Sequence, residues 1–334
     1  MSMGMDMGRL AWISMAGALL VGCVEEPPGE GSDELPMITS ASANPSTSGE
    51  GEGSGGATGG PASGPTTTPS ADSSSGGGSD DGPPGISFDL GIPDVPDGKI
   101  PGCQQAVDIV FTMDVSTTMA SFINILADEI LAVDAAIQAL EMPLDTRYGL
   151  AVFVDDAVLL NGGAPYADAD ALRTDFLMWS AFAASNQQVG GGNSNSTWPE
   201  NSLDAIYFAA DGFQWREAET TIRMIIHTTD DTFWDGPTIG NGIPIQHGYA
   251  ETVQRMQDQE VRGYVFADDI GGACVCEDVT PGWSAPYMGM LPIPEATDGA
   301  VYDINEVLSG IVSLADAING AVEDSYCDPY TPVG

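Results

Sequence analysis

The stretch that decides the fold is Val107-Asp-Ile-Val-Phe-Thr-Met-Asp-Val-Ser-Thr-Thr118, a mostly apolar run that leads directly into an Asp-x-Ser-x-Thr turn. Residues 107–113 predict a short buried strand, because they are rich in β-branched and aromatic side chains. Apolar residues then recur at three- or four-residue spacing from Phe122 to Leu140, which predicts a long helix ending before Pro143. A buried strand followed by an amphipathic helix is typical of an α/β domain.

The same alternation continues toward the end of the chain. We expect strands at residues 147–154, 157–160, 222–226 and 261–266 and around 301, and helices at 169–183, 200–210 and 249–259, with one last helix over about 304–322. This order predicts an α/β fold with a doubly wound, mostly parallel sheet and helices on both faces. Ligands of such sheets bind beyond the carboxyl ends of the strands, where the connecting loops meet.

Charge restricts the partners. The 334 residues contain 8 Lys and Arg against 49 Asp and Glu, a net charge of −41, and residues 103–334 alone hold 35 acids and six bases. A chain this acidic repels phosphates, which excludes nucleic acid as the natural partner and disfavours direct binding to an anionic lipid surface. The same charge favours cation binding.

The N-terminus predicts export and lipid attachment. Arg9 precedes an apolar run over residues 10–22, which is too short to span a bilayer but suits a signal peptide. The run ends in Leu20-Val-Gly-Cys23, which resembles the bacterial lipobox, whose cysteine is lipidated. An ordinary cleaved signal or a buried helix is the alternative. We expect the protein to be lipid-anchored in the bacterial cell envelope. Val24, and not Asp, follows Cys23, and by resemblance to Gram-negative lipoproteins this implies the outer membrane rather than the inner.

Composition divides the chain into three parts. Residues 1–23 are the predicted lipoprotein signal peptide and lipobox, and residues 24–102 a disordered acidic linker rich in Gly, Ser, Pro and Thr. Residues 103–334 are the folded domain. The lipid anchor is therefore the only expected contact with the membrane.

Four cysteines remain after Cys23. Cys103 opens the domain and Cys327 lies near its end, and since domain ends often lie close together we favour a disulfide between them. Cys274 and Cys276 then either pair in a tight ring or remain thiols. Four reduced, buried cysteines are the alternative.

Oxygen-bearing side chains gather at the expected strand ends. Asp114, Ser116 and Thr118 follow the first strand at alternate positions, a donor set that suits Mg²⁺ or Mn²⁺. A simple Ser/Thr helix cap is the alternative reading of this turn. A glycine-rich loop, residues 190–200, ends in Thr197-Trp-Pro-Glu200, and Asp230 follows the strand at 222–226.

With these three segments, residues 103–327 resemble the von Willebrand factor type A (vWA) family and its metal-ion-dependent adhesion site. That family carries Asp-x-Ser-x-Ser after its first strand, a Thr or a Pro-Glu glutamate in a later loop, and an Asp at the end of the fourth strand. Thr118 replaces the last serine and keeps the hydroxyl. Asn195-x-Thr197-x-Pro-Glu200 is similar to the Asn-x-Asp-x-Pro-Glu of integrin β subunits, but Thr197 stands where those have Asp, which puts an adjacent second metal site in doubt. The resemblance implies a metal site made by Asp114, Ser116, Thr118, Asp230 and either Thr197 or Glu200.

The resemblance also implies a function. The family leaves one metal position open for a Glu or Asp of another protein, so we expect a divalent cation, with Mg²⁺ favoured over Mn²⁺ or Ca²⁺, and a protein ligand that presents an acidic residue. Trp198 and Trp234 flank the site as candidates for ligand contact, or as ordinary packed aromatics. Residues 268–298 are either a specificity loop or a disulfide-linked substitute for a helix. Asp155 and Asp156 are expected in a solvated turn.

The sequence also bears on two other functional classes. A hydrolase is disfavoured, because the chain has only two histidines, His227 and His247, and lacks the His-Glu-x-x-His and Gly-x-Ser-x-Gly motifs. We therefore expect a binding protein and not an enzyme. A structural surface lipoprotein with a degenerate metal site is the other alternative.

Overall fold

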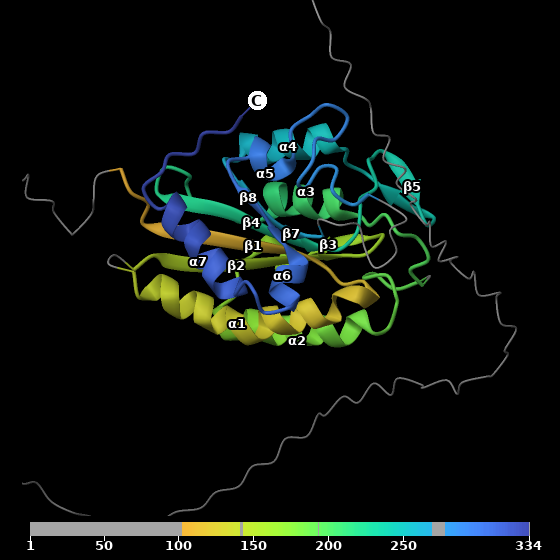
Figure 1. Cartoon of the computed structure of the whole chain (residues 1–334), viewed down its shortest axis with the longest axis horizontal. Helices are drawn as coiled ribbons and strands as arrows, with labels where there is room; N and C mark the ends of the chain where they lie inside the picture. Colours follow the sequence, from red (N-terminus) through yellow and green to blue (C-terminus); the bar gives the residue numbers. More distant parts are fainter. Residues whose placement is uncertain (1–101, 141–142, 193, 269–277, 334) are drawn as a thin grey trace, which may run out of the picture. The chain divides into compact units, whose positions relative to one another are not determined.

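The structure, a computed structural model, describes residues 102–140, 143–192, 194–268 and 278–333. The expected signal peptide, Cys23 and the linker lie outside these residues, as do Cys274 and Cys276. The described part holds a six-stranded sheet in the order β3-β2-β1-β4-β7-β8 and a separate β5-β6 hairpin (Figure 1). Neighbours in the large sheet are parallel except β2 and β3. The strands are β1 (Ala106–Asp114), β2 (Asp145–Phe153), β3 (Ala157–Leu159), β4 (Thr221–Thr229), β5 (Thr238–Gly240), β6 (Ile243–Ile245), β7 (Arg262–Ala267) and β8 (Ala300–Asp303).

Helices cover both faces of the sheet, which confirms the predicted fold class. Helices α1, α2 and α7 lie on one face, and α3 and α4 on the other (Figure 1). Within the described residues, no helix is long and apolar enough to cross a membrane. The helices are α1 (Ala120–Gln138), α2 (Ala169–Ala183), α3 (Ser202–Gly212), α4 (Tyr249–Asp258), α5 (Ile293–Ala296), α6 (Ile304–Leu308) and α7 (Leu314–Ser325), with short 3₁₀ turns at Thr117–Met119 and Leu160–Gly163.

Strand β1 is the centre of the fold. It pairs with β2 on one side and β4 on the other, and all nine of its residues are buried. Successive side chains point to opposite faces, so Ile109 and Phe111 pack with α1 and α2 whereas Val110 packs with α3 and α4. This double burial explains the nearly continuous apolar sequence of β1. It also fixes the position of Asp114, its last residue.

The prediction of one last helix was wrong. The segment forms two helices, α6 and α7, and Gly310 between them has a φ of 73°, in the left-handed region that favours glycine. The Ser313 side chain then caps α7 by accepting a hydrogen bond from the Asp316 amide. The carboxylate of Glu129 on α1 accepts a second one from the Ala315 amide, at 2.7 Å, which ties the start of α7 to α1.

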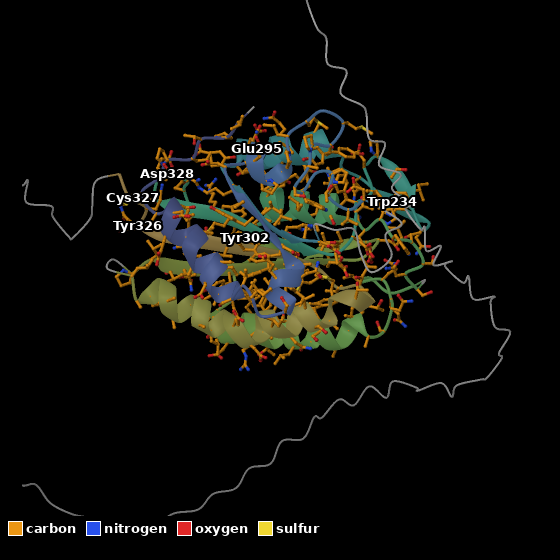
Figure 2. All side chains as sticks on the ribbon, viewed as in Figure 1. Trp234, Glu295, Tyr302, Tyr326, Cys327 and Asp328 are labelled. Carbon is orange, nitrogen blue, oxygen red and sulfur yellow. A yellow bond between two sulfur atoms is a disulfide. The ribbon has the colours of Figure 1, made fainter. Side chains whose placement is uncertain are left out.

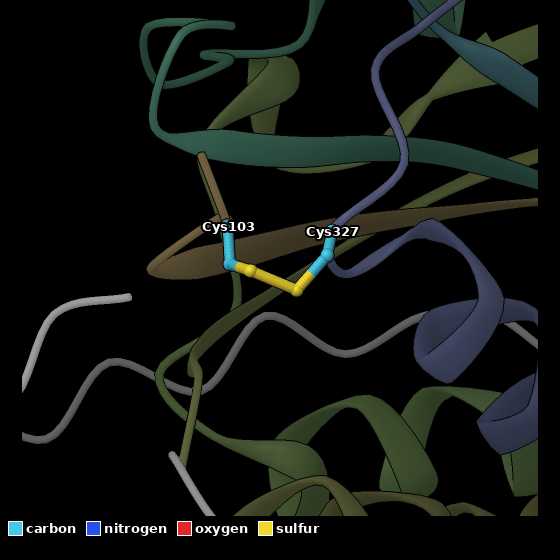
Figure 3. The surroundings of a disulfide bond; sticks show 2 residues. All are labelled: Cys103 and Cys327. Atoms are coloured by element: carbon cyan, nitrogen blue, oxygen red, sulfur yellow. A yellow bond between two sulfur atoms is a disulfide. The ribbon is translucent and has the colours of Figure 1, made fainter. Parts of the chain in front are cut away.

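The two ends of the domain are joined. Cys103 and Cys327 form a disulfide, the pairing favoured from their positions in the sequence (Figure 3). Beside it, the Gln104 amide donates a hydrogen bond to the Tyr326 carbonyl at 2.8 Å. Figure 2 shows Cys327 at one end of the domain and Trp234 at the other. The disulfide therefore lies where β1 begins, away from the carboxyl ends of the strands.

Candidate metal centre

The candidate centre lies where β1 and β4 end side by side. Asp114 is fully buried there, and both of its carboxylate oxygens accept a hydrogen bond. The Ser116 amide donates to Oδ1 and the Thr229 hydroxyl donates to Oδ2, each at 2.8 Å. The carboxylate is thus held by one contact from its own turn and one from the neighbouring strand.

The hydroxyls of the turn continue this network. Ser116 Oγ lies 3.2 Å from Thr118 Oγ1, which donates to Asp230 Oδ1 at 3.0 Å. The alternative reading of Ser116 as a helix cap is not supported, because its side chain makes no cap hydrogen bond to the turn that follows. The side-chain oxygens of Ser116 and Thr118 therefore connect the turn after β1 to Asp230, which follows β4.

Three aspartates converge at this point. One carboxylate oxygen from each of Asp114, Asp230 and Asp231 lies within 4.8 Å of the other two. Oxygens on opposite sides of a Mg²⁺ ion are about 4.2 Å apart, and those around Ca²⁺ about 4.6–5.2 Å. The three acids are spaced for sharing one cation. Asp231 was not among the residues expected from the sequence.

Glu200, the expected ligand from the glycine-rich loop, is not one of the three carboxylates in this group. A short parallel bridge holds its backbone, with the Glu200 amide donating to the Thr232 carbonyl and the Trp234 amide donating to the Glu200 carbonyl. The side chain is 0% exposed. Its Oε1 accepts a hydrogen bond from Asn195 at 2.7 Å, but Oε2 has no hydrogen-bond partner within the described residues. A buried, unpaired carboxylate oxygen is costly unless a proton or a cation compensates it.

The pKa values of the carboxyl groups at this centre are raised, as expected for buried acids without a compensating cation. Burial, and then repulsion from Asp114, Asp155 and Asp231, raises the pKa of Glu200 to about 11. Burial, reinforced by the charge of Asp230, raises the pKa of Asp114 to about 7. Burial raises the pKa of Asp230 as well. Without a cation Glu200 retains its proton at neutral pH, and a divalent cation would stabilise the ionised forms of all three carboxyl groups.

Thr197 lies in a different network. Its hydroxyl donates to Asp155 at 2.7 Å, and the Asp155 carboxylate also accepts hydrogen bonds from Gln188 and Asn241. The expectation that Asp155 is part of a solvated turn was therefore wrong, because the residue is fully buried. Asp156 next to it is half-buried and accepts the backbone amides of the glycine-rich loop. Asp155 thus holds the glycine-rich loop by accepting hydrogen bonds from neutral side chains, and the Thr197 hydroxyl is one of these donors.

The two tryptophans differ in exposure. Trp198 is 48% exposed beside Glu200, so it is available to a ligand. Trp234 packs into the protein, since a Cβ on Gly240 would lie 2.5 Å from its indole nitrogen. Of the two roles expected for Trp234, ligand contact or packing within the loop, the structure supports packing.

The loop that follows β7 is described from residue 278 onward. Trp283 is buried there against Phe233 and His227, and its indole nitrogen donates to the Asp231 carbonyl at 3.4 Å. This part of residues 268–298 therefore packs an aromatic side chain against the segment that carries Asp231. Its two cysteines lie outside the described residues.

His227 is a structural histidine. It is fully buried, its Nδ1 lies 2.8 Å from the Thr112 hydroxyl, and its ring stacks on Phe153. Burial lowers its pKa to about 3, so the ring is neutral. His247 is half-buried just before α4 and bonds through Nδ1 to Asp204.

The sequence analysis missed the contribution of the β5-β6 hairpin. Asn241 at its turn donates to Asp155 at 2.9 Å and accepts from Ser196 at 3.1 Å, which fastens the hairpin to the glycine-rich loop. Asn241 and Gly242 both have positive φ, as a two-residue hairpin turn requires. An Asn-Gly pair between Ile239 and Ile243 is a strong hairpin signal that could have revealed it.

Comparison with known proteins finds only distant structural similarity. No protein-family model matches the sequence, and no curated protein matches it. Among solved structures, an aerotolerance-related membrane protein from Bacteroides fragilis matches at 14% identity and a TM-score of 0.41, covering 66% of this chain and 100% of that one. The human COPII-coat protein Sec24c matches at 11% identity and a TM-score of 0.39, covering 65% of this chain and 33% of that one. Similarity this low says nothing about function, and the fold described above rests on its own strand order.

Proposed function

We propose that this chain is a tethered, metal-dependent protein-binding module of the vWA type, which captures an acidic residue of a partner protein through a divalent cation. The support is the order of three segments in one sheet. Asp-x-Ser-x-Thr follows the central strand β1, Asp230 follows β4, and the Pro-Glu glutamate comes from the loop between them. All three reach the same end of the sheet.

The observation that carries the proposal is the environment of Glu200. Its Oε2 is buried without a hydrogen-bond partner in the described part of the chain, while the charges of Asp114 and Asp231 repel it. A cation bound by these groups removes the repulsion and supplies the missing partner. The hard oxygen donors favour Mg²⁺, with Mn²⁺ and Ca²⁺ as further candidates.

The ion would also explain how so acidic a protein binds an acidic partner. A net charge of −41 repels carboxylates at a distance, so their capture requires a local positive charge. Asp114, Ser116, Thr118, Asp230 and Glu200 would hold the ion, and the exposed Trp198 ring would pack against the partner. We propose binding and not catalysis, because the buried His227 is in no position to act as a general base.

The proposal includes the cellular location of the protein. The lipobox-like Leu20-Val-Gly-Cys23 and the apolar run before it support lipid attachment in a bacterial cell envelope, with the outer membrane favoured. The linker of residues 24–102 would then hold the domain away from the lipid, over a distance of the order of 50 Å for a random coil. Mass spectrometry of the mature chain tests whether Cys23 carries lipid.

A thermal melt of the full chain with EDTA, Mg²⁺ or Mn²⁺ tests the metal. We expect either ion to raise the melting temperature of the parent and to leave Asp114→Ala unchanged. Glu251→Gln removes one charge from an exposed site on α4 and should retain the shift. A folded parent that shows no shift with either ion would leave a metal-free structural lipoprotein as the better reading.

A further inference from the structure

An apolar groove, here called the α4 groove, lies between α4 and the loop that leads into α5. Its volume is about 320 Å³, at the lower end of the range for ligand pockets. Among the described residues no acidic side chain lines it, although the chain holds 49 Asp and Glu residues. Six of the lining residues are apolar: Ala250, Val253, Met290, Leu291, Ala296 and Val333. So neutral a surface on so acidic a protein is suited to an apolar segment of chain.

The C-terminal segment shows how far the α4 groove lies from the start of the domain. Cys327 is bonded to Cys103, with 4.1 Å between the two Cα atoms. Six residues later Val333 lines the groove, and its carbonyl accepts a hydrogen bond from Gln257 of α4 at 3.5 Å. Figure 1 shows this segment passing from α7 toward α4. An extended chain advances at most about 3.6 Å per residue, so the groove begins within roughly 22 Å of Cys327.

The chain that precedes Cys103 carries an apolar segment of its own, outside the described residues. In Ile86-Ser-Phe-Asp-Leu-Gly-Ile92 every second residue is apolar, so an extended chain presents all four apolar side chains on one face. The connection from Ile92 to Gly102 contains Pro93, Pro96 and Pro101, which favour an extended backbone. At about 3.1 Å per residue it spans roughly 31 Å. This is longer than the path from the disulfide to the α4 groove.

We propose that the α4 groove binds residues 86–92 of the same chain, with the Phe88 and Leu90 side chains inserted into it. Tethering holds the segment at an effective concentration of the order of millimolar, so even a weak contact is largely formed. A second copy is a poorer occupant, because each chain carries a net charge of −41 and the copies repel each other. The tether then leaves the domain beside α4 and not at the start of β1.

Thermolysin digestion of the full chain tests the contact, because the protease cuts before large apolar residues and a bound segment is protected. Mass spectrometry follows cleavage before Phe88, and cleavage before Ile38, in the same linker but outside the segment, is the internal reference. Ala250→Glu places a charged side chain at the groove. Ala132→Glu makes the same exchange at an exposed position of α1 and is the matched control.

Relative to the cut before Ile38, we expect the parent to be cleaved before Phe88 at least about tenfold more slowly than Ala250→Glu. Ala132→Glu should be cleaved as slowly as the parent. Phe88→Ser leaves the described domain unchanged, so it is a second test that does not depend on the folding of a domain variant. It should speed cleavage before Leu90 about tenfold.

Equal cleavage in the parent and in all three variants would overturn the proposal. Protection that persists in folded Ala250→Glu would place the segment away from the α4 groove. Protection that increases with protein concentration would assign the groove to a second copy. Either result would also overturn the proposal. These cleavage rates do not depend on the metal centre, so they are decided separately from the proposed function.

Discussion

The Thr229 hydroxyl donates a 2.8 Å hydrogen bond to Asp114 Oδ2, linking the ends of two strands that are 115 residues apart in sequence. Both residues are fully buried, so the bond fixes the orientation of a carboxylate that has little alternative solvation. The turn after β1 supplies the other oxygen's donor. The geometry of the candidate ligand is thus set by β4 as much as by the motif that contains it.

Thr229→Val should lower the cation-free stability by about 1–3 kcal/mol, because it leaves a buried carboxyl oxygen without its donor. It should also weaken Mn²⁺ binding, since Asp114 is no longer held in one orientation. Thr228→Val is the matched control: Thr228 is equally buried, and its hydroxyl has no hydrogen-bond partner within the described residues. Urea unfolding and Mn²⁺ titration should separate the two variants. Equal losses of stability and of Mn²⁺ affinity in the two variants would show that the hydrogen bond from Thr229 to Asp114 has no special role.

A comparison of Glu200→Gln with Thr197→Val decides which residue of the glycine-rich loop binds the metal. Glu200→Gln removes a charge from the centre and should weaken Mn²⁺ binding about tenfold or more. The Thr197 hydroxyl donates to Asp155, so Thr197→Val should destabilise the loop but leave the affinity for Mn²⁺ within about threefold of the parent. Isothermal calorimetry gives both affinities. The reverse order would assign the metal contact to Thr197.

The stability of the cation-free protein should fall as the pH rises from 7 to 9. Burial raises the pKa of Glu200 to about 11, whereas an unfolded glutamate titrates near 4.3. The folded state therefore keeps a proton that the unfolded state has lost. The resulting stability is complete below the unfolded pKa and disappears as the pH rises through the folded pKa. The slope is at most about 1.4 kcal/mol per pH unit for this one group.

Urea unfolding in EDTA at pH 7, 8 and 9 measures this slope. Saturating Mg²⁺ should reduce it, because the cation replaces the proton. Glu200→Gln, which has no proton to lose, should flatten it as well. A parent whose stability is constant over this range would contradict the raised pKa.

Loss of the terminal disulfide should cost about 3–5 kcal/mol, because Cys103 and Cys327 close a loop with a sequence separation of 224 residues. The double variant Cys103→Ser/Cys327→Ser should melt at a lower temperature than the parent under non-reducing conditions. Cys23→Ser leaves this bond intact and serves as the control. Mn²⁺ affinity should survive in the folded double variant, since the centre lies at the other end of β1. An unchanged melting temperature would show that the bond adds no stability.

The part of the fold that the sequence predicted depends on periodicity. Residues 107–140 predicted a strand and a helix because a buried strand and an amphipathic helix impose long, distinct patterns, and the structure has β1 and α1 there. Gly310 shows the limit of this reasoning. The apolar spacing continues across it from α6 to α7, so the pattern hides a turn that depends on one left-handed residue.

The candidate centre was predictable only in part, for a related reason. Asp114 and Asp230 follow predicted strands, and parallel strands bring their carboxyl ends together. Burial of Asp155 could not be inferred, because its donors Gln188 and Asn241 lie 33 and 86 residues further along the chain. Asp231 was overlooked because the family motif ends at its neighbour, whereas proximity in space depends on how the loop leaves β4.

The position of the disulfide has a mechanical consequence. Cys103 lies three residues before β1, and Asp114 is the last residue of that strand, so tension between the preceding chain and a captured partner would run along one strand of roughly 26 Å. Since β1 is paired along its length with β2 and β4, such a pull would shear two rows of hydrogen bonds at once instead of opening them singly. The covalent link to Cys327 would pass part of the strain to α7.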